Sequence, residues 1–111
     1  MSLSLDEFKC KHCGKLQIDS AFFSRISRAR VIADVPFIIN SGYRCPEHNA
    51  AVGSTSENHT SGKAADIKAM DGPTRGKILM GLYTAGFKRV GVAKDFIHCD
   101  TSDDVESCWL Y

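Results

Sequence analysis

The sequence predicts a single α+β domain, with a small, mostly antiparallel sheet of short strands and helices on one side of it. Two segments with helical apolar spacing are interspersed with short strand-like runs, and the last two runs are only three residues apart, a hairpin spacing. Such a mixture is typical of a sheet with segregated helices. The chain has 111 residues, so residues 1–111 are expected to share one core.

The predicted helices are marked by capping and stop residues. Asp19 or Ser20 can cap the first helix, which Pro36 ends. Its apolar side chains recur at helical spacing: Phe22, Phe23, Ile26, Ala29, Ile32 and Ala33. A shorter helix is expected over residues 46–52, and a further helix begins after the turn at 71–74 and ends at Gly86. The last helix should place four side chains on one face: Ile78, Leu79, Leu82 and Tyr83.

Four short strands are expected, over residues 37–40, 64–69, 89–92 and 96–100. Side chains alternate between the two faces of a strand, so Ile67 should face the core and Asp66 the opposite side. In the last strand, Phe96, His98 and Asp100 share one face, and Ile97 and Cys99 share the other. The apolar tail at residues 108–111 is expected to pack against the body.

Composition argues against several classes of protein. A formal net charge of +1 and the lack of a basic run give no reason to expect nucleic-acid binding. No apolar run approaches the ~18 residues that a membrane span needs. The first seven residues do not resemble a signal peptide. We therefore expect a protein made in the cytoplasm that reaches any external target by another route. A monomer is also expected.

Five cysteines cannot all pair within one chain, which argues against a disulfide framework. Cys10 and Cys13 form a CxxC motif, while Cys45 and His48 form a CxxH motif. The two motifs would make a closed Cys₃His zinc site if they met in space. Reduced, half-buried thiols are favoured over that site, because the spacing between the halves is unusual for a zinc finger. The two other thiols, Cys99 and Cys108, are expected to be small core residues.

His59, Asp66 and His98 form the strongest candidate site. His59 lies in a predicted loop over residues 53–62, which is rich in Ser, Thr, Asn and Gly, and the other two lie on predicted strands. Two neutral nitrogens and one oxygen suit Zn²⁺, and three protein ligands leave its fourth position free for water. Each residue alone is more typical of an ordinary polar position, but the set favours zinc binding.

Several motifs resemble those of the M15 metallopeptidases. They follow one another along the chain: Ser41-Gly42-Tyr43-Arg44, Asn49-Ala50-Ala51-Val52-Gly53, His59-x-x-Gly62-x-Ala64-x-Asp66-Ile67, Phe96-Ile97-His98-x-Asp100 and Trp109-x-Tyr111. This family includes zinc D-Ala-D-Ala carboxypeptidases and dipeptidases, and phage endolysins that cut the L-Ala-D-Glu bond of peptidoglycan. The resemblance runs from Phe8 onward and implies a Hedgehog/DD-peptidase-like fold with zinc ligands at His59, Asp66 and His98. Glu57 departs from the pattern, because it stands where the family usually has serine.

The resemblance also implies a general base and a substrate-binding arginine. In some branches the base lies three residues before the last ligand histidine, which is Asp95 here. Asp95 can serve only from the turn before the strand, since strand alternation would point it away from His98. Asp100 is a rival base, although a partner of His98 is its expected role, and Glu57 is a third candidate. The family's arginine for the substrate carboxylate falls on Arg44, whose planar guanidinium can donate two parallel bonds.

We therefore expect a hydrolase: a zinc metallopeptidase that cuts stem peptides of peptidoglycan at the bacterial cell wall. It would be a D-Ala-D-Ala carboxypeptidase or an endolysin-type L-Ala-D-Glu endopeptidase. The alternative is a non-catalytic zinc-containing binding module or phage structural module, since the similar Hedgehog signalling domain shares the fold and zinc ligands. The sequence leaves open the bond that is cut, the cysteine state and a phage or bacterial origin.

Overall fold

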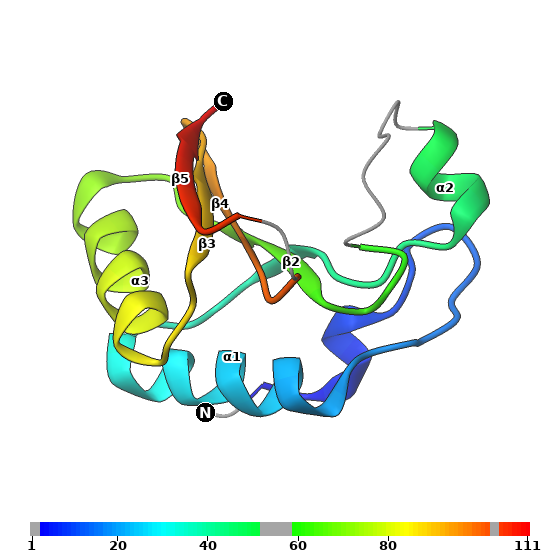
Figure 1. Cartoon of the computed structure of the whole chain (residues 1–111), viewed down its shortest axis with the longest axis horizontal. Coiled ribbons are helices and arrows are strands. Elements are labelled where there is room, and N and C mark those ends of the chain that lie inside the picture. The colour runs from blue at the N-terminus through cyan, green and yellow to red at the C-terminus, as the bar shows by residue number, and fades with distance from the viewer. Residues whose placement is uncertain (1–2, 52–58, 103–104) are drawn as a thin grey trace.

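The computed structural model describes residues 3–51, 59–102 and 105–111, apart from the side chain of His48. Its elements follow in the order η1 (Leu5–Phe8), α1 (Ser20–Ala33), β1 (Ile39–Ser41), α2 (Pro46–Ala51), β2 (Ala64–Lys68), α3 (Gly72–Thr84), β3 (Arg89–Val92), β4 (Phe96–Asp100) and β5 (Ser107–Leu110) (Figure 1). The predicted α+β class is confirmed.

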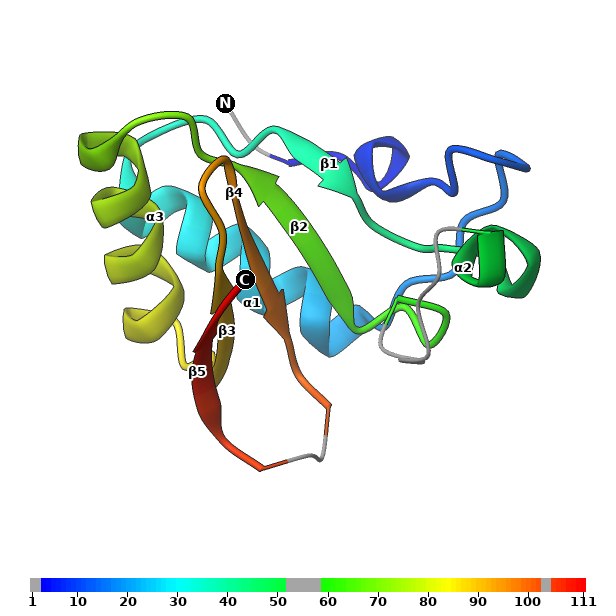
Figure 2. The ribbon, with the colours of Figure 1, turned by 90° about the horizontal axis from the view of Figure 1, so that it is seen from above.

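The five strands form one mixed sheet in the order β1-β2-β4-β3-β5. Three neighbouring pairs are antiparallel, and only β5 runs parallel to its partner, β3. Helices α1 and α3 pack against each other beside the sheet, while α2 lies at the other end of the molecule from α3 (Figures 1 and 2). The sheet therefore has one face covered by α1 and α3, and one face available for a site.

The core forms between the sheet and these two helices, as the strand alternation predicted. Ile67 of β2 and Ile97 of β4 are fully buried, while Asp66 and His98 point to the opposite face. Aromatic rings complete this core: Phe22 of α1 makes an edge-to-face contact with Phe87 at a centroid distance of 5.8 Å. Burying these apolar surfaces supplies the main stabilisation of so small a domain.

Capping at the start of the long helices agrees with the sequence. Asp19 is the N-cap of α1, and its side chain accepts a hydrogen bond of 2.9 Å from the backbone N–H of Phe22. The helix ends three residues earlier than Pro36, because Asp34 adopts a left-handed conformation at φ 57° and terminates it. Gly86 takes the same role after α3, at φ 101°.

Several expectations about exposure and boundaries are wrong. Ile32 is 40% exposed and Tyr83 47% exposed, because each lies to the side of a narrow buried stripe rather than on it. Cys108 is also exposed, since it belongs to the edge strand β5. The first strand begins at Ile39 instead of residue 37, and η1, which buries Phe8, was not predicted.

Other predictions concern residues outside the described part of the chain. The end of the short helix at residues 52–53 and most of the predicted loop at 53–62 belong to this group.

In the described residues, no helix is long and apolar enough to cross a bilayer.

Gly81 sets the closeness of α1 and α3. A Cβ added there would lie 2.5 Å from the carbonyl oxygen of Ala29 and 2.8 Å from Cβ of Ala33. Gly81→Ala is therefore expected to lower the free energy of unfolding by about 1–3 kcal/mol, because the helices must separate. The matched control is Gly76→Ala in the same helix, where an added Cβ meets nothing within 4 Å. The control should raise stability by up to about 1 kcal/mol through helix propensity.

Urea denaturation of both variants, followed by circular dichroism, measures these changes. Equal effects of the two substitutions would contradict the role given to Gly81.

Candidate metal centre

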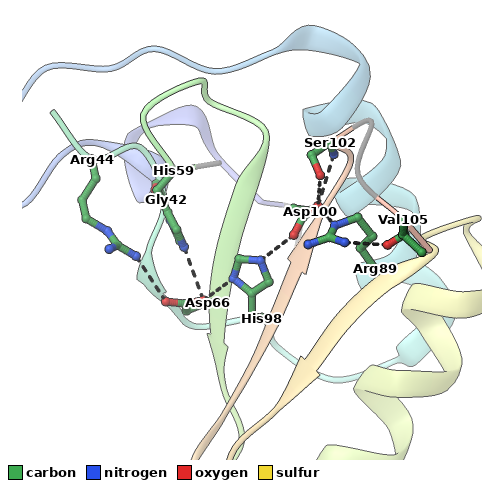
Figure 3. Close-up of polar contacts among 9 residues, drawn as sticks. All are labelled: Gly42, Arg44, His59, Asp66, Arg89, His98, Asp100, Ser102 and Val105. Carbon is green, nitrogen blue, oxygen red and sulfur yellow. Dashed lines mark hydrogen bonds and ion pairs between the residues drawn. The ribbon is translucent and has the colours of Figure 1, made fainter. Parts of the chain in front are cut away.

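The structure brings together the three residues that the sequence predicted as ligands. His59 Nε2 lies 3.5 Å from Asp66 Oδ1, and His98 Nδ1 lies 2.9 Å from the same oxygen (Figure 3). One ligand atom from each residue falls within 4.8 Å of the others. Both imidazoles thus aim at a single carboxylate oxygen, which is an arrangement that can enclose a cation.

Strand pairing positions two of these side chains. Asp66 of β2 and His98 of β4 are direct partners in the antiparallel ladder, so they stand side by side on the face away from α1 and α3. His59 approaches from the turn before β2. That turn is held by a hydrogen bond of 3.1 Å from the backbone N–H of Arg44 to the carbonyl of His59.

The ring of His59 is oriented by a backbone carbonyl. Its Nδ1 lies 2.8 Å from the oxygen of Gly42, and this contact is buried. A carbonyl oxygen can only accept, so Nδ1 carries the proton and donates it. Nε2 faces Asp66: in the neutral ring it carries the lone pair that can bind a metal, and in the protonated ring it can donate to Asp66. A backbone or carboxylate partner on the far nitrogen is the usual arrangement around metal-binding histidines.

His98 lies between two carboxylates. Its Nδ1 faces Asp66 and its Nε2 lies 2.7 Å from Asp100 Oδ2. Burial lowers the pKa of His98, but the hydrogen bonds to Asp100 and Asp66 outweigh burial and raise it above its usual value. A proton or a metal ion on Nδ1 would each satisfy Asp66, so the two compete for this nitrogen.

Asp66 itself is ionised at neutral pH. Burial raises its pKa, yet hydrogen bonds from His59 and His98 together outweigh burial, and the pKa falls well below its usual range. One anionic oxygen donor and two imidazole nitrogens make a set that fits Zn²⁺. The set leaves a coordination position for water or substrate.

Asp100 is saturated by its neighbours. Its fully buried carboxylate accepts bonds from His98, from Arg89 Nε at 2.8 Å, and from the hydroxyl and backbone N–H of Ser102 at 2.9 and 3.2 Å. Burial raises the pKa of Asp100, but these bonds, chiefly those from His98 and Ser102, lower it more. This geometry fits a partner that orients His98 rather than a base.

Arg89, which donates to Asp100, was not among the residues predicted for the site. The guanidinium also donates to the carbonyl of Val105 at 2.6 Å and stacks on Trp109, 5.0 Å from the ring centroid. The loop expected over residues 93–95 would have paired residue 89 with residue 99, whereas the hairpin pairs Val92 with Ile97, and this shift of one residue places Arg89 opposite Asp100.

Trp109 forms an aromatic wall beside the site. Its ring centroid lies 5.5 Å from that of His98. The indole lies against Gly91 of the neighbouring strand β3, where an added Cβ would collide with the ring, so this packing of Trp109 requires glycine.

Arg44 lies beside the three candidate ligands, as Figure 3 shows. Its Nη2 is 3.7 Å from Asp66 Oδ2, while Nε and Nη1 donate to Ser41 Oγ and Asn49 Oδ1, each at 3.3 Å. The last two partners are neutral, so they orient the guanidinium without cancelling its charge.

Comparison with known proteins agrees with this geometry. Residues 2–100 match the family described as Peptidase M15. The chain belongs to the M15 family. No curated protein matches the chain. The matched M15 region includes the three candidate ligands, Arg44 and Asp100, and it stops before β5. Family membership and the ligand geometry together indicate a metallopeptidase.

Asp95, the general base predicted from the M15 pattern, lies apart from the polar contacts of the candidate ligands. Asp95 lies in the exposed turn between β3 and β4, and its backbone oxygen accepts a bond of 2.9 Å from Ala69 N–H. Among the described residues, none of the polar contacts of the three ligands involves Asp95. Glu57 lies outside the described residues. Asp95 therefore stays a prediction.

A second group of possible ligands lies elsewhere in this M15 chain. The thiols of Cys10, Cys13 and Cys45 offer sulfur atoms within 4.8 Å of one another. The fourth residue named for this group, His48, has a side chain outside the described part. Cys99 is fully buried, as predicted.

Asp100→Asn tests the support of His98. Replacing the carboxylate by a neutral amide makes the imidazole of His98 a weaker ligand and removes the negative charge that pairs with Arg89. Zinc affinity should therefore fall by about 10–100-fold. The matched control is Asp95→Asn, which makes the same charge change in an exposed turn and should leave affinity unchanged. Competition against a chromogenic chelator measures both, and wild-type affinity in Asp100→Asn would show that His98 needs no such partner.

Proposed function

We propose that this M15 family protein is a zinc-dependent peptidase that hydrolyses bonds in the stem peptides of peptidoglycan. One observation carries the proposal: two oriented imidazoles converge on one oxygen of an ionised carboxylate, with a guanidinium beside the other oxygen. A buried structural ion would need the first three groups but not the arginine. On this view the protein is a monomer that is made in the cytoplasm and acts at the bacterial cell wall after release.

His59, Asp66 and His98 would hold the ion through Nε2, a carboxylate oxygen and Nδ1. When bound, zinc supplies a Lewis acid that polarises the scissile carbonyl and acidifies a water molecule. The chain contributes preorganisation, because the Gly42 carbonyl and the Asp100 carboxylate hold the two rings in place before substrate arrives.

A general base must take a proton from water and return it to the leaving amine. We assign this role to Asp95. Asp95 lies in the turn before β4 and not in the strand itself, so strand alternation does not point its side chain away from His98. Asp100 is disfavoured because His98, Arg89 and Ser102 already engage its oxygens.

Arg44 is assigned to the substrate carboxylate. Ser41 and Asn49 hold the guanidinium beside the candidate metal ligands, so a carboxylate bound there would lie next to the reacting bond. Stem peptides end in a free carboxylate and also carry one on D-Glu. Such a clamp therefore suits a D-Ala-D-Ala carboxypeptidase and an L-Ala-D-Glu endopeptidase alike.

Digestion of purified peptidoglycan by the zinc-loaded protein tests the proposal. Mass spectrometry should detect released fragments, and a zinc chelator should abolish their release. Loss of one terminal alanine would identify a carboxypeptidase, and cleavage between L-Ala and D-Glu would identify an endopeptidase. No release by metal-loaded protein would contradict the proposal and favour a non-catalytic binding or phage structural module.

Asp95→Ala should keep its zinc and lose about 10²–10⁴-fold in kcat, because a general base is not a ligand. Lys94→Ala, in the same exposed turn, is the matched control and should keep wild-type kcat. Metal content and steady-state rates measure the two effects. Loss of zinc from Asp95→Ala, or an unchanged rate, would reject this role.

Arg44→Ala should raise KM by about 10–100-fold, which corresponds to the loss of a charge-assisted hydrogen bond worth about 1.5–3 kcal/mol. Arg44→Lys should recover only part of this loss, because an ammonium cannot donate two parallel bonds. Arg28→Ala on the exposed surface of α1 controls for net charge. Unchanged kinetics in Arg44→Ala would make Arg44 a purely structural partner of Asp66.

A further inference from the structure

Three thiols gather at the end of the molecule where α2 lies, outside the candidate metal centre. Cys10 and Cys13 belong to the segment between η1 and α1, and Cys45 directly precedes α2. The sulfur atoms lie within 4.8 Å of one another, although Cys45 is 35 residues from Cys10. Three thiols are an odd number, so they cannot all be consumed by disulfide pairing among themselves.

We propose that Cys10, Cys13 and Cys45 bind a second zinc ion, which fixes the N-terminal segment against the loop that carries Arg44. A tetrahedral ion with Zn–S bonds of about 2.3 Å places its sulfurs about 3.8 Å apart. The observed grouping therefore needs only small side-chain movements to reach that geometry. Binding converts each S–H to a Zn–S bond and releases its proton to solvent.

The backbone around the CxxC motif supports this site. Gly14 follows the second thiol with φ 74°, and its N–H donates a 2.9 Å bond to the carbonyl of Cys10, which closes a tight turn. The N–H of Cys45 donates to the sulfur of Cys10 at 3.3 Å. The turn thus directs the thiols toward one point, and the backbone supplies a donor to a developing thiolate.

An imidazole borders the three thiols. His12 Nδ1 lies 3.5 Å from the sulfur of Cys45. Cys10 and Cys45 are buried while Cys13 is exposed, and a surface pocket lined by Cys13, Tyr43 and Cys45 opens beside them. An ion can therefore enter from solvent and, once bound, be shielded on its inner side.

The loop after β1 connects this cluster to the first metal centre. Gly42 packs against Phe8 so closely that a Cβ would lie 2.6 Å from Phe8 Cα, and Tyr43 N–H donates to the Phe8 carbonyl at 2.8 Å. The same loop orients His59 through Gly42 and ends at Arg44, next to Cys45. The cluster would thereby be a positioning element, and this consequence rests on the proposed function, whereas the metal site itself does not.

The test counts metal on the full chain. Zinc-loaded wild-type protein should hold about two equivalents of zinc. Losing a residue that only supports a metal ligand lowers affinity by about 10–100-fold. Cys13→Ser removes a ligand itself, the exposed thiol, so affinity for the second equivalent should fall by more than this. The matched control is Cys108→Ser, an exposed thiol on β5, which should keep both equivalents. Circular dichroism checks that each variant is folded.

A His59→Ala/His98→Ala variant isolates the thiol site. It should retain about one equivalent, and Co²⁺ in place of zinc should give the near-ultraviolet charge-transfer absorption of cobalt thiolates. Absence of that absorption, or wild-type metal affinity in Cys13→Ser, would overturn the proposal.

Kinetics then separate this inference from the proposed function. Cys13→Ser should raise KM more than it lowers kcat, because Arg44 loses its anchor. Two equivalents of zinc without hydrolysis would reject the peptidase and keep the thiol site. Hydrolysis by protein that holds a single equivalent of zinc, bound at the histidines, would keep the peptidase and reject the thiol site.

Discussion

The pairing of β2 with β4 is the constraint on which the candidate metal centre depends. In this register Asp66 stands opposite His98 on one face, while Ile67 stands opposite Ile97 on the other. A slip by one residue would turn both polar side chains into the core and expose the isoleucines. Hydrophobic burial under α1 and α3 therefore fixes the positions of Asp66 and His98 relative to each other.

Charge distribution at the centre is set by a chain of alternating groups. Arg44, Asp66, His98, Asp100 and Arg89 follow one another with opposite or complementary character. Burial raises the pKa of both carboxylates, but hydrogen bonds from His59 and His98 lower that of Asp66, and bonds from His98, Ser102 and Arg89 lower that of Asp100. The two carboxylates in turn raise the pKa of His98 against the effect of its burial. Movement of any one member breaks its contacts with the members on either side, and this coupling restrains the whole chain of groups.

The loop between β1 and α2 connects two regions that could otherwise be treated separately. Within four residues it orients His59 through a carbonyl, carries Arg44 and supplies Cys45. Its backbone is also held by Phe8 from the N-terminal segment. Order in the N-terminal segment is thus transmitted to the site through backbone contacts, whether or not the thiols hold an ion.

Local patterns were enough for the fold class, the helix starts and the last hairpin. Asp19 caps the helix that it was expected to cap, and β3 and β4 have the predicted bounds. These features depend on hydrogen bonds and alternation within a few residues, which a sequence displays directly. The expected burial of Ile32, Tyr83 and Cys108 was wrong, because the burial of a side chain at the edge of a helix face or a sheet depends on how much of that surface the neighbouring element covers.

The sequence by itself determined which side chains could bind a metal, since His59, Asp66 and His98 carry the required atoms and their spacing matches the M15 pattern. Only the tertiary structure decided which nitrogen of each ring is available, because the Gly42 carbonyl and Asp100 make that choice across the fold. It also decided that Cys45 meets the CxxC motif. Contacts between residues far apart in the chain follow from packing, and no local pattern encodes them.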